Sequence, residues 1–173
     1  MRACVLVVTD DQPPDAVSET LETLDGTFSE TTVVCPSGQR DAVSDVSDGR
    51  ATRVVETVSD GGVVAALRTG FRATKATRAF VTTPSMPAVD AESVTQLAPA
   101  PGHDATLAVI NGTEKPPLGG YVTETAAAAC DTTLATGSRR LSNVFARLSV
   151  TAAVVERPAR TNGGTSTKAT CDD

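Results

Sequence analysis

The sequence predicts an α/β fold in which a mixed, mostly parallel sheet is covered by helices on both sides. Two observations support this prediction: short apolar runs typical of strands alternate with helix-like segments, and the connections between them are short. The 173 residues are enough for one domain with a sizeable core. We expect that domain to span residues 1–156 and residues 157–173, which are rich in Thr, Gly and Ser, to form a disordered tail.

The first part of the chain is predicted to form two strands, each followed by a helix. Residues 3–8 (ACVLVV) are a continuous apolar run, which is typical of a buried parallel strand. Pro13 and Pro14 can open a helix, and the apolar residues after them recur at helical spacing before a glycine ends it. Residues 31–35 (TTVVC) predict the next strand, and a weak polar helix is expected over residues 37–46.

The middle of the chain repeats this alternation. A short strand is expected over residues 52–58, followed by a helix that begins at Gly62 and has one apolar face. Residues 78–82 (RAFVT) predict a strand that enters a proline-rich loop. Asp90 is placed to cap a short helix that extends through Leu97.

The last third is expected to add two strands and two helices. Residues 104–110 (DATLAVI) predict a strand that ends in an Asn-Gly turn. Residues 115–121 are expected to lead into a helix that Gly137 stops. A second helix over residues 141–148 and a last strand over residues 151–156 follow.

Ligands bind at the carboxyl ends of the strands in open α/β sheets. We therefore expect the site to be built from the loops after the predicted strands that end at Val8, Cys35, Val58 and Thr82.

Acidic residues outnumber basic ones by 21 to 15, and the basic set holds 12 arginines but only three lysines. This composition resembles that of proteins from salt-loving archaea, and an ordinary acidic protein from a high-GC genome is the alternative. Residues 1–60 carry a net charge of −8, and residues 61–173 carry +2. The chain has no dense basic face, which argues against a nucleic-acid binder, while a local basic site in the second half stays open.

No apolar run approaches the roughly 20 residues of a membrane span, and residues 1–8 are followed by no signal-peptide cleavage pattern. These features predict a cytoplasmic protein that does not bind membranes. The cysteine spacing excludes a zinc knuckle or a redox CxxC pair and predicts reduced core cysteines. The four cysteines are Cys4, Cys35, Cys130 and Cys171.

Three collinear segments carry a resemblance to a known family. Residues 59–71 (SDGGVVAALRTGF) have an acidic residue before a glycine-rich helix start, and residues 79–89 (AFVTTPSMPAV) have a strand before a Met-Pro loop. Residues 117–148 contain a Pro-Leu pair, a Tyr and a Gly-x-Arg-Arg pattern spread over two helices. Together these segments resemble the molybdenum cofactor guanylyltransferase (MobA-like) family.

The resemblance implies a three-layer Rossmann-like fold of the nucleotide-diphospho-sugar transferase type. It also implies transfer of a guanylyl group from GTP to the phosphate of molybdopterin, with magnesium as the cofactor. In such a site a glycine-rich loop with an Arg and a Lys holds the triphosphate, and an Asp after a later strand holds the metal. The implied partners are GTP, molybdopterin and a molybdoenzyme or its maturation protein.

The resemblance places nucleotide binding at Asp60, Gly61 and Gly62, with Thr9 and Asp10 in the loop after the first strand. Asp60 matches the family's base-reading position, and a helix N-cap is the alternative. The two glycines permit close approach of a ligand, but they also suit an ordinary strand-to-helix turn.

Molybdopterin binding is expected at Arg139 and Arg140, which match basic positions of the family. Paired guanidinium groups suit phosphate oxygens. The alternative is a pair of surface arginines at a helix start.

The sequence departs from the family at both catalytic points. Where the family has a glycine-rich, basic loop, this chain has Thr9, Asp10 and Asp11, and residues 3–39 contain no Arg or Lys. Ser85 takes the place of the metal-binding Asp, and a serine hydroxyl is a poor primary ligand for magnesium. The metal candidates are therefore Asp10, Asp11 and Ser85, and no catalytic residue is assigned.

Three hypotheses follow from these residues. The first is a guanylyltransferase relative with impaired catalysis. The second is a non-catalytic partner that binds molybdopterin or a nucleotide during molybdoenzyme maturation. The third is a sugar-phosphate nucleotidyltransferase relative, which the Gly-x-Arg-Arg helix pair disfavours.

Overall fold

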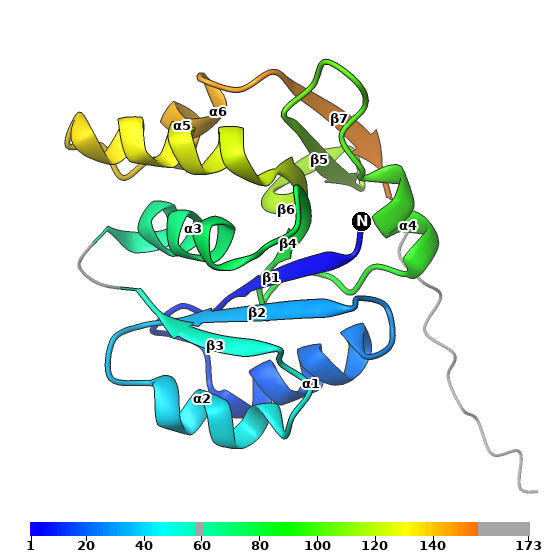
Figure 1. The fold of residues 1–173 in the computed structure, drawn as a ribbon. Coiled ribbons are helices and arrows are strands. Elements are labelled where there is room, and N and C mark those ends of the chain that lie inside the picture. The colour runs from blue at the N-terminus through cyan, green and yellow to red at the C-terminus, as the bar shows by residue number, and fades with distance from the viewer. Residues whose placement is uncertain (58–60, 156–173) are drawn as a thin grey trace, which may run out of the picture.

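The computed structural model describes residues 1–57 and 61–155, which form a seven-stranded sheet with helices on both faces (Figure 1). The strands are β1 (Ala3–Val7), β2 (Glu30–Cys35), β3 (Arg53–Glu56), β4 (Arg78–Thr82), β5 (Ala105–Ile110), β6 (Thr113–Val122) and β7 (Val150–Val154). The helices are α1 (Pro14–Leu24), α2 (Arg40–Ser47), α3 (Gly62–Ala73), α4 (Ala91–Gln96), α5 (Thr123–Ala135) and α6 (Leu141–Phe145). The predicted α/β architecture is confirmed.

The strand order in the sheet is β3-β2-β1-β4-β6-β5-β7. The pairs β3–β2, β2–β1, β1–β4 and β5–β7 are parallel, whereas β6 runs antiparallel to both of its neighbours. The sheet is therefore mixed and mostly parallel, as predicted. Since β1, β2, β3 and β4 run in the same direction, their carboxyl ends lie along one edge of the sheet.

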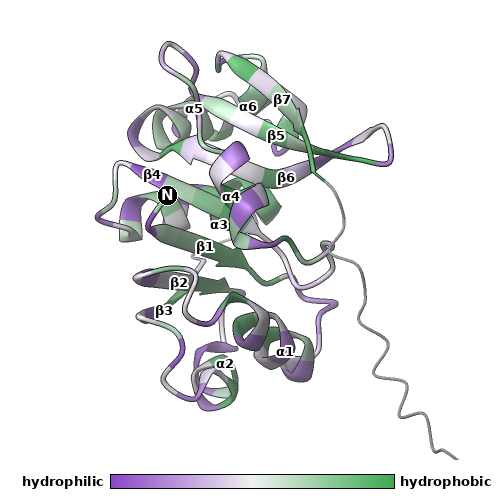
Figure 2. Ribbon diagram, turned by 90° about the vertical axis from the view of Figure 1, so that its right-hand side faces the viewer, coloured by the Kyte–Doolittle hydropathy of each residue, from purple (hydrophilic) through white to green (hydrophobic). Residues whose placement is uncertain are grey.

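The helices form two outer layers around the sheet. Helices α3, α5 and α6 pack on one face, and α1, α2 and α4 pack on the other. Figure 2 shows the consequence for hydropathy: the strands are largely hydrophobic, and the outer surfaces of the helices carry the hydrophilic residues.

Strand β1 is buried on both faces, which explains its unbroken apolar sequence. Val5 and Val7 belong to the cluster under α3 and α5, while Leu6 belongs to the cluster under α1 and α2. Because side chains alternate along a strand, each face of β1 contributes to a different layer of the core.

Strand β6 corrects one expectation from the sequence. Residues 115–121 were expected only to lead into a helix, but they lie within a ten-residue strand that pairs with β4 and β5. Its prolines and glycines hide the strand pattern, because both are depleted in strands. The glycines are needed for packing: a Cβ on Gly119 would collide with the carbonyl oxygen of Thr106, and one on Gly120 with that of Leu97.

The turn predicted at Asn111 and Gly112 does connect β5 to β6, and both residues have positive φ. Other boundaries differ from the prediction by small amounts. Helix α6 ends at Phe145 rather than continuing to residue 148, and β7 begins at Val150.

The expected cap of α4 is confirmed, since the Asp90 side chain accepts a hydrogen bond from the Ser93 amide at 2.8 Å. The tail predicted over residues 157–173 lies outside the described residues.

Cys4, Cys35 and Cys130 are free and buried, as predicted for core cysteines. Burial and the nearby carboxylate of Glu56 raise the pKa of Cys35 to about 11, so its thiol stays neutral near pH 7. No helix within residues 1–57 and 61–155 is long and apolar enough to cross a membrane.

Candidate functional site

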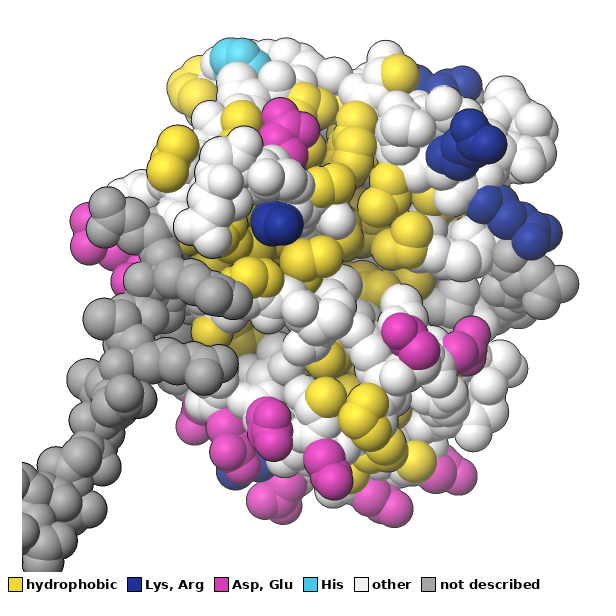
Figure 3. All heavy atoms as spheres, turned by 180° about the vertical axis from the view of Figure 1, so that it is seen from behind, with side chains coloured by type: hydrophobic (Ala, Val, Ile, Leu, Met, Phe, Trp, Pro, Cys, Tyr) yellow, Lys and Arg dark blue, Asp and Glu magenta, His cyan; other side chains and the backbone are white. Residues whose placement is uncertain are grey.

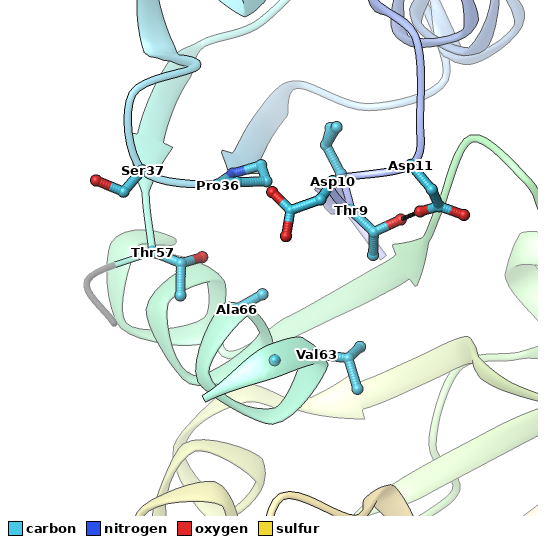
Figure 4. Close-up of a pocket in the computed structure, with 10 residues that line it drawn as sticks. Thr9, Asp10, Asp11, Pro36, Ser37, Thr57, Val63 and Ala66 are labelled. Carbon is cyan, nitrogen blue, oxygen red and sulfur yellow. Dashed lines mark hydrogen bonds between the residues drawn. The ribbon is translucent and has the colours of Figure 1, made fainter. Parts of the chain in front are cut away.

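A pocket of about 580 Å³ opens at the carboxyl edge of the sheet, over the ends of β1, β2 and β3 (Figure 4). Three loops and the first turns of α3 supply its walls. The volume falls within the range of roughly 300–1,000 Å³ that is usual for small-molecule sites. The pocket lies at the edge of the sheet where the sequence predicted a site, but the loop after Thr82, which was expected to contribute, is not part of its wall.

The loop after β1 forms the first wall through Val8, Thr9, Asp10 and Asp11. In Figure 4 the Asp10 carboxylate points into the space between this loop and α3. The hydroxyl of Thr9 donates to an oxygen of Asp11. The structure thus brings three sequence-predicted residues, Thr9, Asp10 and Asp11, together in one wall.

This loop is closed by its own hydrogen bonds. The amide of Thr9 donates to Oε1 of Gln12 at 3.0 Å, and the amide of Gln12 donates to the carbonyl oxygen of Thr9 at 3.1 Å. A triphosphate-binding loop needs amides that point outward at the ligand. Here two of the amides are already used within the loop.

The loops after β2 and β3 form the second wall, with Pro36, Ser37 and Thr57 facing the pocket. Glu56 is not among the residues that line this wall; its Oε1 accepts from the amides of Gly38 and Arg40 at 2.9 and 3.4 Å. The loops were predicted as part of the site, but these side chains were not. Their position directly after each strand was the only signal in the sequence.

Helix α3 forms the third wall through Gly62, Val63 and Ala66. The expected role of Gly62 in the site is consistent with its position, and its φ of 58° is one that glycine adopts without strain. Gly61 is the N-cap residue of α3 and does not line the pocket. A Cβ on Gly61 would collide with Ala65, which supports its role in the strand-to-helix turn.

Asp60, which was expected to read the nucleotide base, lies outside the described residues. Within the described residues, α3 begins at Gly62 and Gly61 holds the N-cap position.

Ser85 does not belong to the pocket wall. It lies in the loop after β4, where its hydroxyl is 2.9 Å from the hydroxyl of Thr83. Ser85 is therefore not brought together with Asp10 and Asp11 in this site.

Arg139 and Arg140 are exposed and lie outside the pocket wall. They stand just before α6, and neither takes part in an ion pair within the described residues. On the face drawn in Figure 3, acidic side chains gather around α1 and α2, and several basic side chains lie toward the other end of that face.

The described wall of the pocket carries two carboxylates and no Lys or Arg. Two unit charges about 4 Å apart interact by about 1 kcal/mol in water and about 4 kcal/mol at the effective dielectric constant of a protein surface. A triphosphate with roughly four negative charges would therefore be repelled by Asp10 and Asp11.

The residues expected to hold magnesium fit that role poorly. Within residues 1–57 and 61–155, no group of three or more His, Cys, Asp or Glu side chains is arranged to hold a metal. Asp11 already accepts from Thr9, and Ser85 is in contact with Thr83. Among the described lining residues, the carboxylates of Asp10 and Asp11 are two charged ligands where a group of three or more would be needed.

A family model described as the MobA-like NTP transferase domain matches residues 5–154. This range runs from β1 to β7 and contains the pocket at the edge of the sheet. No curated protein matches the sequence.

Several solved structures share the fold. A protein from Aquifex aeolicus VF5 is 13% identical, with a TM-score of 0.73 over 90% of this chain and 88% of that one. Molybdopterin-guanine dinucleotide biosynthesis protein A from Archaeoglobus fulgidus is 20% identical, with a TM-score of 0.65 over 89% of this chain and 83% of that one. The 2-C-methyl-D-erythritol 4-phosphate cytidylyltransferase from Thermus thermophilus is 16% identical, with a TM-score of 0.60 over 90% of both chains. At these identities the likeness shows the fold alone.

Proposed function

The chain belongs to the MobA-like NTP transferase domain family, and from that premise we propose that it is a guanylyltransferase relative whose transfer activity is impaired. The observation behind the proposal is that Asp10 and Asp11 line the wall after β1, at the point where the sequence resemblance implies a glycine-rich basic loop. The same pocket at the carboxyl edge is retained as a binding site for a small molecule.

The side chains that line the pocket support loss of nucleotidyl transfer rather than loss of small-molecule binding. Transfer of a nucleotidyl group needs cationic groups or a metal to stabilise charge on the phosphates. The described wall supplies neither a cation nor a complete metal site. The sheet edge and the hollow above it are intact, so a ligand without a polyphosphate group can still be accommodated.

The proposal is tested by product formation. Purified protein is incubated with GTP, magnesium and molybdopterin, and the dinucleotide is measured beside an active guanylyltransferase as the positive control. We expect no dinucleotide above the level without protein. Formation of dinucleotide that is lost in Asp10→Ala would instead mean that the aspartates hold a metal and that the site has been rebuilt for transfer.

A second candidate function, a non-catalytic molybdopterin-binding partner, is favoured by Arg139 and Arg140. Both side chains are exposed and form no ion pair within the described residues. Each charge-assisted hydrogen bond from such a guanidinium to phosphate contributes about 1.5–3 kcal/mol. We expect Arg139→Ala/Arg140→Ala to weaken binding of a phosphorylated pterin at least tenfold. Arg78→Ala, which removes another exposed arginine, is the control, and equal affinity in all three proteins would remove this candidate.

A further inference from the structure

Resting on the function proposed above, we propose that the pocket at the ends of β1, β2 and β3 takes an uncharged nucleoside in preference to the corresponding nucleotides. The pocket is a true hollow of about 580 Å³ rather than a set of acidic side chains on a flat surface. Its walls come from three separate loops and from α3, so its shape is determined by the sheet and not by the acidic loop alone.

The first wall offers acceptors to a hydroxyl-bearing ligand. A carboxylate only accepts hydrogen bonds, and its two oxygens can receive the hydrogens of neighbouring hydroxyl groups such as those of a ribose. Acidic side chains recognise ribose hydroxyls in this way in dinucleotide-binding folds. Asp10 points into the pocket, and Asp11, which also lines it, accepts from Thr9 with one oxygen.

The facing walls suit the flat, apolar body of a base. Pro36, Val63 and Ala66 present apolar surface, while Thr57 adds a hydroxyl group at one side (Figure 4). Predominantly apolar walls with a few polar groups are the usual composition of a small-molecule site. No cation among the described lining residues balances the charge that each added phosphate would bring.

The test compares nucleosides with their own phosphates in the absence of metal. Guanosine, GMP and GTP, and likewise cytidine, CMP and CTP, are titrated calorimetrically into the full chain in the presence of EDTA. We expect the affinity to fall with each phosphate and to drop at least tenfold from nucleoside to triphosphate. Asp10→Asn/Asp11→Asn should raise the triphosphate affinity at least tenfold relative to that of the nucleoside.

A matched control separates the pocket from the overall charge. Glu19→Gln/Asp25→Asn removes the same charge at exposed positions outside the pocket wall and should leave the order of affinities unchanged. Melting temperatures establish that all variants are folded. Tighter binding of the triphosphates, or failure of both nucleosides to bind, contradicts the nucleoside preference. Formation of the dinucleotide from GTP and molybdopterin would instead contradict the proposed function. Failure of the nucleoside preference and failure of the proposed function are therefore distinguishable.

Discussion

Asp90 illustrates how one side chain positions a loop near the carboxyl edge. Its carboxylate accepts from the Ser93 amide at 2.8 Å and begins α4 directly after the proline-rich loop. Val94 and Leu97 are thereby held in the core beside Phe80 of β4. The hydrogen bonds from Ser93 lower the pKa of Asp90, because they favour the charged form.

The first prediction concerns Asp90→Ala. Because the folded-state pKa is depressed, the stability that the carboxylate contributes is present above the unfolded-state pKa of about 4 and is lost as the pH falls through the folded-state value. We expect the variant to melt below wild type at pH 7 and the difference to shrink below about pH 4. Asp90→Asn, which keeps the acceptor without titrating, is the control. A difference between Asp90→Ala and wild type that stays constant from pH 7 to acid would contradict this assignment.

At the scale of elements, α3 packs closely against the sheet. Gly70 of α3 packs directly on the sheet, where an added Cβ would collide with Val5 and lie 3.1 Å from Cγ2 of Val34. Helix propensity alone would favour alanine here by about 0.5–1 kcal/mol. The structure opposes that preference, because the extra methyl group has no space.

The second prediction is that Gly70→Ala lowers the free energy of unfolding by about 1–3 kcal/mol, since overpacking forces α3 away from β1 and β2. Urea denaturation measures it. Thr69→Ala, the neighbouring position on the same helix, is the control and should change stability less. A Gly70→Ala protein at least as stable as wild type would mean that α3 does not approach the sheet so closely.

The helices and strands differ in how well the sequence predicted them. Strands buried on both faces, such as β1, and amphipathic helices, such as α3, were predicted because their periodicity reflects their burial directly. Strand β6 was missed, because its glycines and prolines meet packing constraints imposed by distant residues. The position of the pocket followed from strand direction, but Ser37 and Thr57 could not be chosen before the loops were placed, nor Ala66 before the position of α3 was known.

For the whole molecule, the main physical feature is the uneven distribution of charge. The net charge of −6 combines a strongly acidic first 60 residues with a slightly basic remainder. On the face drawn in Figure 3, acidic side chains gather around α1 and α2. Like charges on α1, α2 and the loop after β1 repel one another, and dissolved ions screen that repulsion.

The third prediction is that the melting temperature rises between low and molar potassium chloride. Added ions screen the repulsion among the carboxylates of residues 1–60. Thermal melts at several salt concentrations measure it. Glu19→Gln/Asp25→Asn removes two negative charges from residues 1–60 and should therefore reduce the salt dependence of the melting temperature. A melting temperature that is unchanged or lower in molar salt would contradict the halophile-like interpretation of the composition.

The central claim is that the acidic wall after β1 prevents this member of the family from holding a triphosphate. Calorimetric titration of the protein with GTP and magnesium tests it most directly, with Asp10→Ala titrated in parallel. We predict no saturable binding in the wild type at micromolar concentrations, because Asp10 and Asp11 repel the phosphates and the described wall supplies no cation. Micromolar, magnesium-dependent binding in the wild type that disappears in Asp10→Ala would contradict the claim.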